Sequence, residues 1–388
     1  MKYWRGYLVA AILAACTWAF REFAQTHSQL VDMVYPYVTR MVQTFMANWS
    51  SGVDYCLWQG ILLALIAVAV ATIVLMIIFK WNPIQWFGWI VAVASLILLL
   101  HTGIFGMNEF AGPIAEDIRL SEADCDAQQL EAAAIYYRDM ANSLSGQVSR
   151  EGDNVKAADL KTLNEKAVSG FEKLVYDDYY SVFAGSTLPV KELGMAEYFT
   201  KNGEMGYTVA ITGEAAVNPE APGVMQPFAV CREMCYRMCI ASGRDKHFGA
   251  FLACQANEDP AFQYAAYVMA YRYCLNELPQ ATASTVNAQA NAQVRSDVDA
   301  WEAFIAPAEA RAAERAEKEG LKDTMNAEIT ELLIRWHQQD VVIPSITEPE
   351  VQFDPMDESQ VDLTGLPHIP KVTEAAEEAA EEATEEAA

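Results

Sequence analysis

The sequence predicts an α+β, mainly helical fold, in which membrane-spanning helices precede a globular domain. The first 110 residues hold two uncharged apolar stretches, each longer than the roughly 20 residues that cross a bilayer. Beyond them, apolar residues recur at three-and-four spacing, as on one face of a helix. One short stretch instead alternates apolar with small or polar residues, which indicates a strand. We therefore divide the chain into a membrane region (1–110), a globular domain (111–278), a linker with a charged helical stretch (279–343) and a tail (344–388).

The membrane region contains three predicted membrane helices, at about residues 4–20, 55–79 and 84–107. A short hairpin joins the second and third, and it carries Lys80 beside tryptophans that suit a membrane interface. Between the first and second, residues 28–49 have helix-like apolar spacing that Pro36 interrupts. We expect this segment to lie along the outer membrane interface.

The N-terminal segment supports more than one interpretation. Lys2 and Arg5 precede an apolar run, which fits either an uncleaved membrane helix or a secretory signal. The run Leu13-Ala14-Ala15-Cys16 also resembles a bacterial lipobox, in which Cys16 would be lipidated. In each case the positive N-terminus stays inside, so the chain after Met107 is predicted to be extracytoplasmic.

Composition separates the apolar part of the chain from the acidic part. The chain of 388 residues is 53% hydrophobic and carries a net charge of −26, an unusual pairing for one soluble globule. Much of the acidity lies in residues 344–388, where Lys371 is the only basic residue, and we expect a disordered tail there. An acidic chain without a Lys/Arg-rich stripe argues against nucleic acid as a partner.

The globular domain begins with two predicted helices, which Gly146 and Gly185 follow as stop signals. Alternation over residues 207–211 predicts a strand, and Gly, Asn and Pro after it predict an irregular loop. A further helix begins near Pro227. After residue 278, the sequence predicts a low-complexity linker and then one or two charged surface helices, which pack on the domain or on a partner.

The helix that begins near Pro227 carries “CREMCYRMC” (231–239). At about 100° per residue, Arg232 and Tyr236 share a face, and Glu233 points to an adjacent one. A His-Glu-x-x-His helix uses this geometry to present two imidazoles to zinc and a general base to the metal-bound water. Here Arg232 and Tyr236 occupy the imidazole positions, and an arginine has no lone pair to give to a metal.

Several motifs, in order, are shared with a known family. They are “VYPYV”, “ITGEAAVN” (211–218), “MQPFAVCREM” (225–234), “FGAFLAC” (248–254) and “DPAFQYAAYVMAYRYCLNEL” (259–278). Through them, the chain up to about Leu278 resembles the bacterial integral-membrane family called domain of unknown function 3810, whose members look like membrane-anchored zinc metallopeptidases. The resemblance implies a zincin-like fold for residues 111–278.

The resemblance also implies roles for individual residues. Glu233 stands at the position of the catalytic glutamate, Arg232 and Tyr236 replace the two histidine ligands, and Asp245 holds the position of the acidic third ligand. Losing both imidazoles removes two of the three protein ligands of a catalytic zinc. Glu214 and Asn218 would line the edge of the substrate cleft, although their Gly- and Pro-containing surroundings equally describe a turn.

A rebuilt metal site is one alternative use of nearby side chains. The candidate zinc ligands are Cys235, Cys239, Asp245 and His247. Arg232 and Arg237 would bring positive charge beside the cation, which opposes binding. We therefore expect no cofactor, with zinc as the alternative if the site is rebuilt.

A disulfide is the other alternative for the cysteines, because an extracytoplasmic domain can be oxidised. Cys235 or Cys239 would pair with Cys274, across two helices. Cys231 and Cys254 are expected to be buried as small hydrophobic residues.

The leading functional prediction is a membrane-anchored, extracytoplasmic pseudo-peptidase, which has lost its metal and binds or regulates a peptide or protein ligand. One alternative is an active metallopeptidase with a Cys/Asp/His-substituted zinc site and Glu233 as its base. Another is a structural protein of the cell envelope, in which residues 279–388 make the functional contacts.

Overall fold

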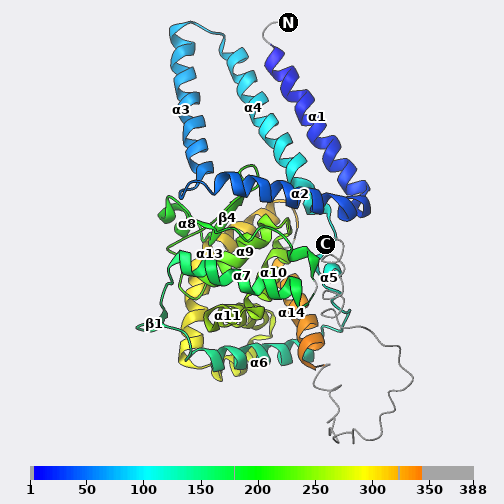
Figure 1. Ribbon diagram of the computed structural model, residues 1–388, viewed down its shortest axis with the longest axis vertical. Helices are drawn as coiled ribbons and strands as arrows, with labels where there is room; N and C mark the ends of the chain where they lie inside the picture. Colours follow the sequence, from blue (N-terminus) through cyan, green and yellow to red (C-terminus); the bar gives the residue numbers. More distant parts are fainter. Residues whose placement is uncertain (1–3, 179, 322–323, 343–388) are drawn as a thin grey trace, which may run out of the picture. The chain divides into compact units, whose positions relative to one another are not determined.

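The computed structural model describes residues 4–178, 180–321 and 324–342. Three long helices extend from one end of a mainly helical globular part (Figure 1). They are α1 (Arg5–Thr26), α3 (Leu57–Ile78) and α4 (Pro83–Ile104), and α2 (Ser28–Ser50) lies between them and the globular part. The tail at residues 344–388, which we predicted to be disordered, lies outside the described residues.

The globular part is built from helices and two small sheets. Its α-helices are α5 (Ile114–Asp117), α6 (Ala127–Leu144), α7 (Leu160–Tyr176), α8 (Ala196–Lys201), α9 (Gln226–Arg237), α10 (Gly243–Ala256), α11 (Pro260–Glu277), α12 (Gln280–Ala288), α13 (Ala292–Lys318) and α14 (Met325–His337). Its shorter helical segments are η2 (Gly106–Phe110), η3 (Ser181–Phe183) and η4 (Gln338–Val342). Its strands are β1 (Arg150–Glu151), β2 (Asn154–Val155), β3 (Lys191–Glu192), β4 (Gly206–Val209) and β5 (Glu214–Val217).

The larger sheet has the order β3-β5-β4, with β3 parallel and β4 antiparallel to β5. The predicted strand is confirmed as β4, but β5 lies where we predicted an irregular loop. The prediction was wrong because every residue of β5 is buried, and a strand buried on both faces has no polar alternation to reveal it.

Helices α1, α3 and α4 are each long and apolar enough to cross a membrane. Helix α1 packs closely on α4, and a Cβ atom on Gly6 would lie 2.5 Å from the carbonyl carbon of Gly88. Such close approach of two backbones is typical of membrane helices that pack through small residues. Cys16, the candidate lipidation site, is exposed on α1, and its lipidation stays a prediction.

Helix α2 runs through Pro36 without a break, whereas we predicted an interruption there. The hydroxyl of Thr39 donates to the carbonyl groups of Tyr35 (2.9 Å) and Pro36 (3.3 Å), so side-chain hydrogen bonds support the backbone around the proline. One face of α2 buries Arg40 and Gln43. The opposite face exposes an apolar stripe, consisting of Met33, Tyr37, Met41 and Phe45. Such a two-faced helix suits a membrane surface.

A buried ionic contact joins the sheet to the start of α3. Glu214, at the start of β5, accepts hydrogen bonds from the backbone N–H groups of Leu57 (2.7 Å) and Trp58 (2.8 Å). Lys191 of β3 completes the contact, with its Nζ atom 2.7 Å from the Glu214 carboxylate. The carboxylate therefore satisfies amides at the helix N-terminus, where a negative charge is favoured.

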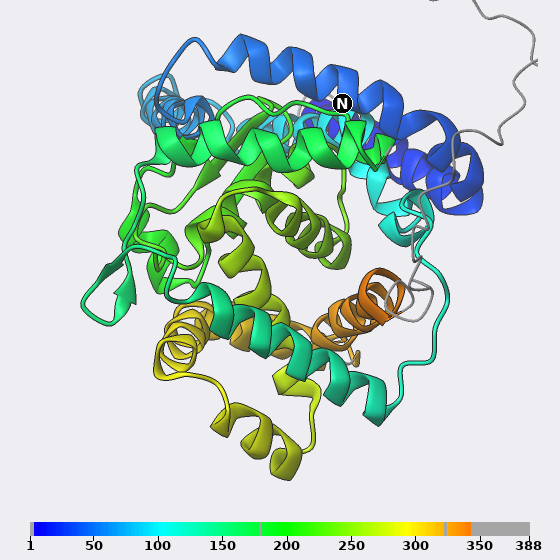
Figure 2. The same ribbon diagram turned by 60° about the horizontal axis from the view of Figure 1, so that its bottom comes forward.

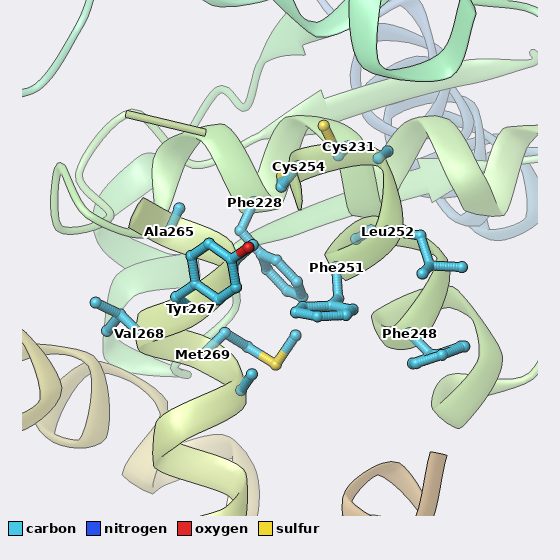
Figure 3. Packing of buried hydrophobic residues seen from close by; sticks show 14 of the residues in the cluster. Phe228, Cys231, Phe248, Phe251, Leu252, Cys254, Ala265, Tyr267, Val268 and Met269 are labelled. Atoms are coloured by element: carbon cyan, nitrogen blue, oxygen red, sulfur yellow. The ribbon is translucent and has the colours of Figure 1, made fainter. Parts of the chain in front are cut away.

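The core of the globular part surrounds α11, whose residues are buried on all sides along most of its length. Phe228 of α9, Phe251 of α10 and Met269 of α11 point toward one another in this core (Figure 3). Because α11 has no polar face, its sequence lacks the one-sided pattern of a surface helix.

The described residues after 278 form helices α12, α13 and α14, which pack on the rest of the globular part, as we predicted for the helices of the charged stretch. The predicted low-complexity linker is corrected, because α12 lies within it. Val286 of α12, Trp301 of α13 and Leu333 of α14 are all buried in the main cluster. In Figure 2 the orange helix α14 lies beside the teal helix α6. Residues 279–321 are rich in alanine and charge, so their composition resembled that of an exposed segment, although α14 carries the apolar run Leu332-Leu333-Ile334.

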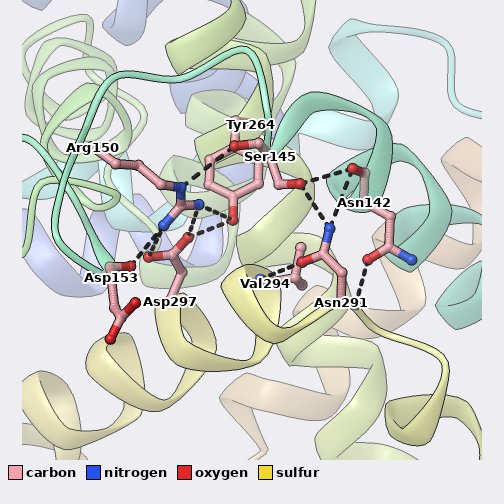
Figure 4. Close-up of polar contacts among 8 residues, drawn as sticks. All are labelled: Asn142, Ser145, Arg150, Asp153, Tyr264, Asn291, Val294 and Asp297. Atoms are coloured by element: carbon pink, nitrogen blue, oxygen red, sulfur yellow. Dashed lines mark hydrogen bonds and ion pairs between the residues drawn. The ribbon is translucent and has the colours of Figure 1, made fainter.

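An ionic network fixes the β1–β2 hairpin to α11 and α13 (Figure 4). The guanidinium of Arg150 donates to Asp297 (2.6 Å) and to the hydroxyl of Tyr264 (3.1 Å). That hydroxyl in turn donates to Asp297 (2.5 Å). Asp297 is 1% exposed, so the buried carboxylate depends on these two donors for its compensation.

Candidate functional site

Glu233 lies at the junction of α9 and β4. Its carboxylate accepts a hydrogen bond from the Thr208 hydroxyl at 2.7 Å, and its other oxygen pairs with the guanidinium of Arg232. A Cβ atom on Gly206 would lie 2.7 Å from the Glu233 Cγ atom, so the glycine lets the glutamate pack against the strand. Each carboxylate oxygen therefore has one donor, and the two contacts fix the orientation of the Glu233 side chain.

A cavity of about 240 Å³ opens beside this pair. Its lining is formed by His101 of α4, Glu204, residues 206–211 of β4 and the turn after it, Arg232, Glu233 and Tyr236 of α9, and Lys246 of α10. The consecutive residues 206–211 show that the strand lies along one wall. The cavity therefore combines a strand, a helix and the last turn of a helix long enough to cross a membrane.

Lys246 is the cationic residue of the cavity that the sequence did not single out. Its ammonium group lies 4.8 Å from the centre of the Tyr236 ring, and it has no ion-pair partner within the described part of the chain. Burial, reinforced by the positive charge of Arg232, lowers the pKa of Lys246 to about 8. Burial also raises the pKa of the Tyr236 hydroxyl to about 12. At pH 7 the Tyr236 hydroxyl is therefore uncharged, and the Lys246 ammonium keeps its positive charge.

Asp245, the predicted third-ligand position, does not share this cavity. It lines a second cavity of about 200 Å³, between α2, α5 and α10, together with Asp32, Asp117 and Cys239. Its carboxylate accepts a hydrogen bond from Arg244 at 2.8 Å. Adjacent residues on a helix point about 100° apart, so Asp245 and Lys246 face different cavities.

The remaining candidate metal ligands are dispersed as well. His247 lines a third depression, and its Nδ1 atom lies 2.7 Å from the Gly243 carbonyl oxygen, to which it donates. Cys235 is fully buried in the core, and Cys239 faces the second cavity. In the described ranges, no group of three or more His, Cys, Asp or Glu side chains is placed to hold a metal. The rebuilt zinc site that we considered does not fit these positions.

The cysteines are all free thiols in the structure, so the disulfide predicted for Cys235 or Cys239 with Cys274 is not formed in it and stays a prediction for oxidising conditions. Cys231 and Cys254 are buried, as predicted. They lie close together in Figure 3, and their thiols interact, which with burial raises the pKa of Cys254 well above its usual range.

Glu214 and Asn218, which the family resemblance assigned to the edge of the cleft, do not line the cavity. Glu214 instead holds the N-terminus of α3. The Asn218 amide donates to the Thr200 hydroxyl (2.9 Å) and to the Glu204 carbonyl (3.1 Å). Both side chains therefore make structural hydrogen bonds, and a contact of either with a substrate stays a prediction.

The family model described as “Protein of unknown function (DUF3810)” matches residues 31–320, which is most of the chain. No curated protein and no solved structure matches the chain significantly.

Proposed function

The chain belongs to this family of proteins of unknown function, and we propose that it is a membrane-anchored pseudo-peptidase, which binds a peptide in the Glu233 cavity without cleaving it. The start of α1 and the turn between α3 and α4 lie at the end of the long helices opposite the globular part (Figure 1), and the sequence places Arg5 in the first and Lys80 in the second. The positive-inside rule would keep this end in the cytoplasm. The cavity would then face the extracytoplasmic side.

The single observation that carries the proposal is the pairing of Glu233 with Arg232. A peptidase glutamate of this kind must take a proton from a metal-bound water. Here Arg232, the residue before it, places a permanent cation where a histidine ligand would stand, and this cation forms an ion pair with the Glu233 carboxylate. A site with this pairing lacks both histidine ligands, and its glutamate is engaged by a cation.

Strand β4, which forms one wall of the cavity, has an edge to which an extended peptide could bind. Strand β4 is last in the order β3-β5-β4, so its outer edge has no strand partner among the described residues. An extended peptide can add to such an edge through backbone hydrogen bonds, with side chains entering pockets beside it. Residues 206–211 would supply the backbone groups.

Hydrogen exchange of the full-length protein in lipid nanodiscs tests the proposal. The probe is a pool of random octapeptides with free termini. We expect added peptide to protect amides at 206–211, and we expect the peptides to be recovered intact. Peptide cleavage that Glu233→Gln abolishes, or the absence of any protection, would contradict the proposal.

Metal content provides a second test of the peptidase-like scaffold. We expect the wild-type protein, purified without chelator, to hold no stoichiometric zinc, and the double variant Arg232→His/Tyr236→His to gain zinc. The matched control is Arg311→His/Arg315→His, which places a histidine pair at the same spacing on α13. Equal zinc in both double variants would show that histidine spacing alone explains the uptake.

A further inference from the structure

The charges around the Glu233 cavity do not balance. The carboxylate of Glu204 already accepts a hydrogen bond from Arg311 at 2.7 Å. Glu233 is then the carboxylate of the lining left for Arg232 and Lys246, and it pairs with Arg232. The Lys246 ammonium lies over the Tyr236 ring and makes no ion pair in the described part of the chain, although Glu233 and Glu204 are near enough to favour its charged form. When Arg311 is counted with the lining, three cations face the two carboxylates.

Part of the Arg232 guanidinium is also unsatisfied. Its Nε atom is buried and has no hydrogen-bond partner in the structure, and the side chain is only 11% exposed. A buried donor without a partner destabilises the protein, and a buried ammonium without an ion pair does so more strongly. An anion that reached both groups would compensate both effects, because charge-assisted hydrogen bonds are the stronger kind.

A larger groove, of about 710 Å³, adjoins the cavity at Arg232 and Glu204. Its walls are mainly apolar and include Met205, Tyr273, Trp301 and Ile305, together with the alanine-rich face of α13. A ligand that places an anionic group at Arg232 can therefore extend apolar side chains into this groove.

Resting on the proposed function, we propose that the bound peptide ends in the cavity, where Arg232 and Lys246 hold its C-terminal carboxylate. The preceding backbone runs along β4, and the terminal side chain enters the apolar groove. The free edge of β4 favours a peptide over an acidic lipid, because a lipid headgroup has no row of N–H and C=O groups to pair with a strand.

The test compares two versions of the same octapeptide pool, one with a free C-terminal carboxylate and one with a C-terminal amide. Binding to the full-length protein is measured by fluorescence anisotropy in nanodiscs of phosphatidylcholine. We expect the free-acid pool to bind at least 10-fold more tightly. Lys246→Met should remove most of this preference, Lys246→Arg should retain it, and Lys201→Met, which neutralises an exposed lysine on α8, should leave it unchanged.

The outcomes separate the two levels of the proposal. Equal binding of the acid and amide pools would overturn the carboxylate site and leave peptide binding intact. Binding of neither pool would overturn both. Loss of free-acid binding in nanodiscs that contain phosphatidylglycerol would assign the cations to an anionic lipid, and would overturn the peptide terminus as their ligand.

Discussion

Replacing Glu214 with alanine should loosen the start of α3. The carboxylate accepts from two backbone amides and pairs with Lys191. A hydrogen bond to a charged group contributes about 1.5–3 kcal/mol, and breaking a buried ion pair costs about 3–5 kcal/mol. Lys191 keeps the carbonyl oxygens of Ser50 and Tyr55 as acceptors. We therefore expect the low end of the range, about 3 kcal/mol.

Hydrogen exchange measures this loss locally. A loss of about 3 kcal/mol corresponds to roughly a 100-fold increase in the opening equilibrium, so the amides of Leu57 and Trp58 should exchange about 100-fold faster in Glu214→Ala. The matched control is Glu192→Gln, an exposed carboxylate on the neighbouring strand.

The double variant Lys191→Met/Glu214→Gln extends this test. It should be less destabilised than the sum of the single variants, because no unpaired charge remains. If exchange of the two amides in Glu214→Ala matched that in Glu192→Gln, the carboxylate would not be the helix cap, and the reasoning would be refuted.

Three further results are expected. Asp297→Asn should lower the free energy of unfolding by about 3 kcal/mol, because Arg150 loses its carboxylate, whereas the exposed Asp299→Asn should change thermal unfolding little. Lys246→Met should stabilise the protein at pH 7, because the pKa of Lys246 in the folded protein is about 8, below its ordinary value of 10.5. The cost of burying the ammonium falls as pH rises from 8 to 10.5, so the stability gained by the variant should shrink over that range. Burial, with repulsion from nearby aspartates, raises the pKa of Asp117 to about 6. Asp117→Asn should therefore stabilise the protein at pH 7.5. Denaturant titrations should show that this gain in the free energy of unfolding vanishes as pH falls from 6 to 4. An advantage for either variant that did not change with pH would count against titration as its cause.

Local sequence signals predicted the elements whose causes are local. The apolar lengths of α3 and α4 and the one-sided patterns of α6 and α7 have such causes. The N-caps Asp126 and Asp159, which accept from amides of the first turn, define the starts of α6 and α7. These features need no partner from elsewhere in the chain.

The features that were missed depend on tertiary contacts. Strand β5 is hidden because its small residues are buried on both faces. The burial of α13 and α14 was underestimated because Trp301 and Leu333 become core residues only through packing against other helices, such as α11. In the candidate site, the motif identified Glu233, but nothing near Lys246 in the sequence indicates that it meets Arg232. Only the packing of α10 against α9 brings the two cations together.

The attachment of the sheet to α3 also determines how far the cavity can reach. His101, in the last turn of α4, is part of the cavity wall, and Glu214 fixes the same sheet to the first turn of α3. These contacts join the sheet directly to α3 and α4, so the cavity does not move relative to these helices as a domain on a long flexible linker would. The distance of the cavity from the membrane is therefore determined by where α3 and α4 end. Partners would have to come to the bilayer surface, where a shared membrane raises the local concentration of both.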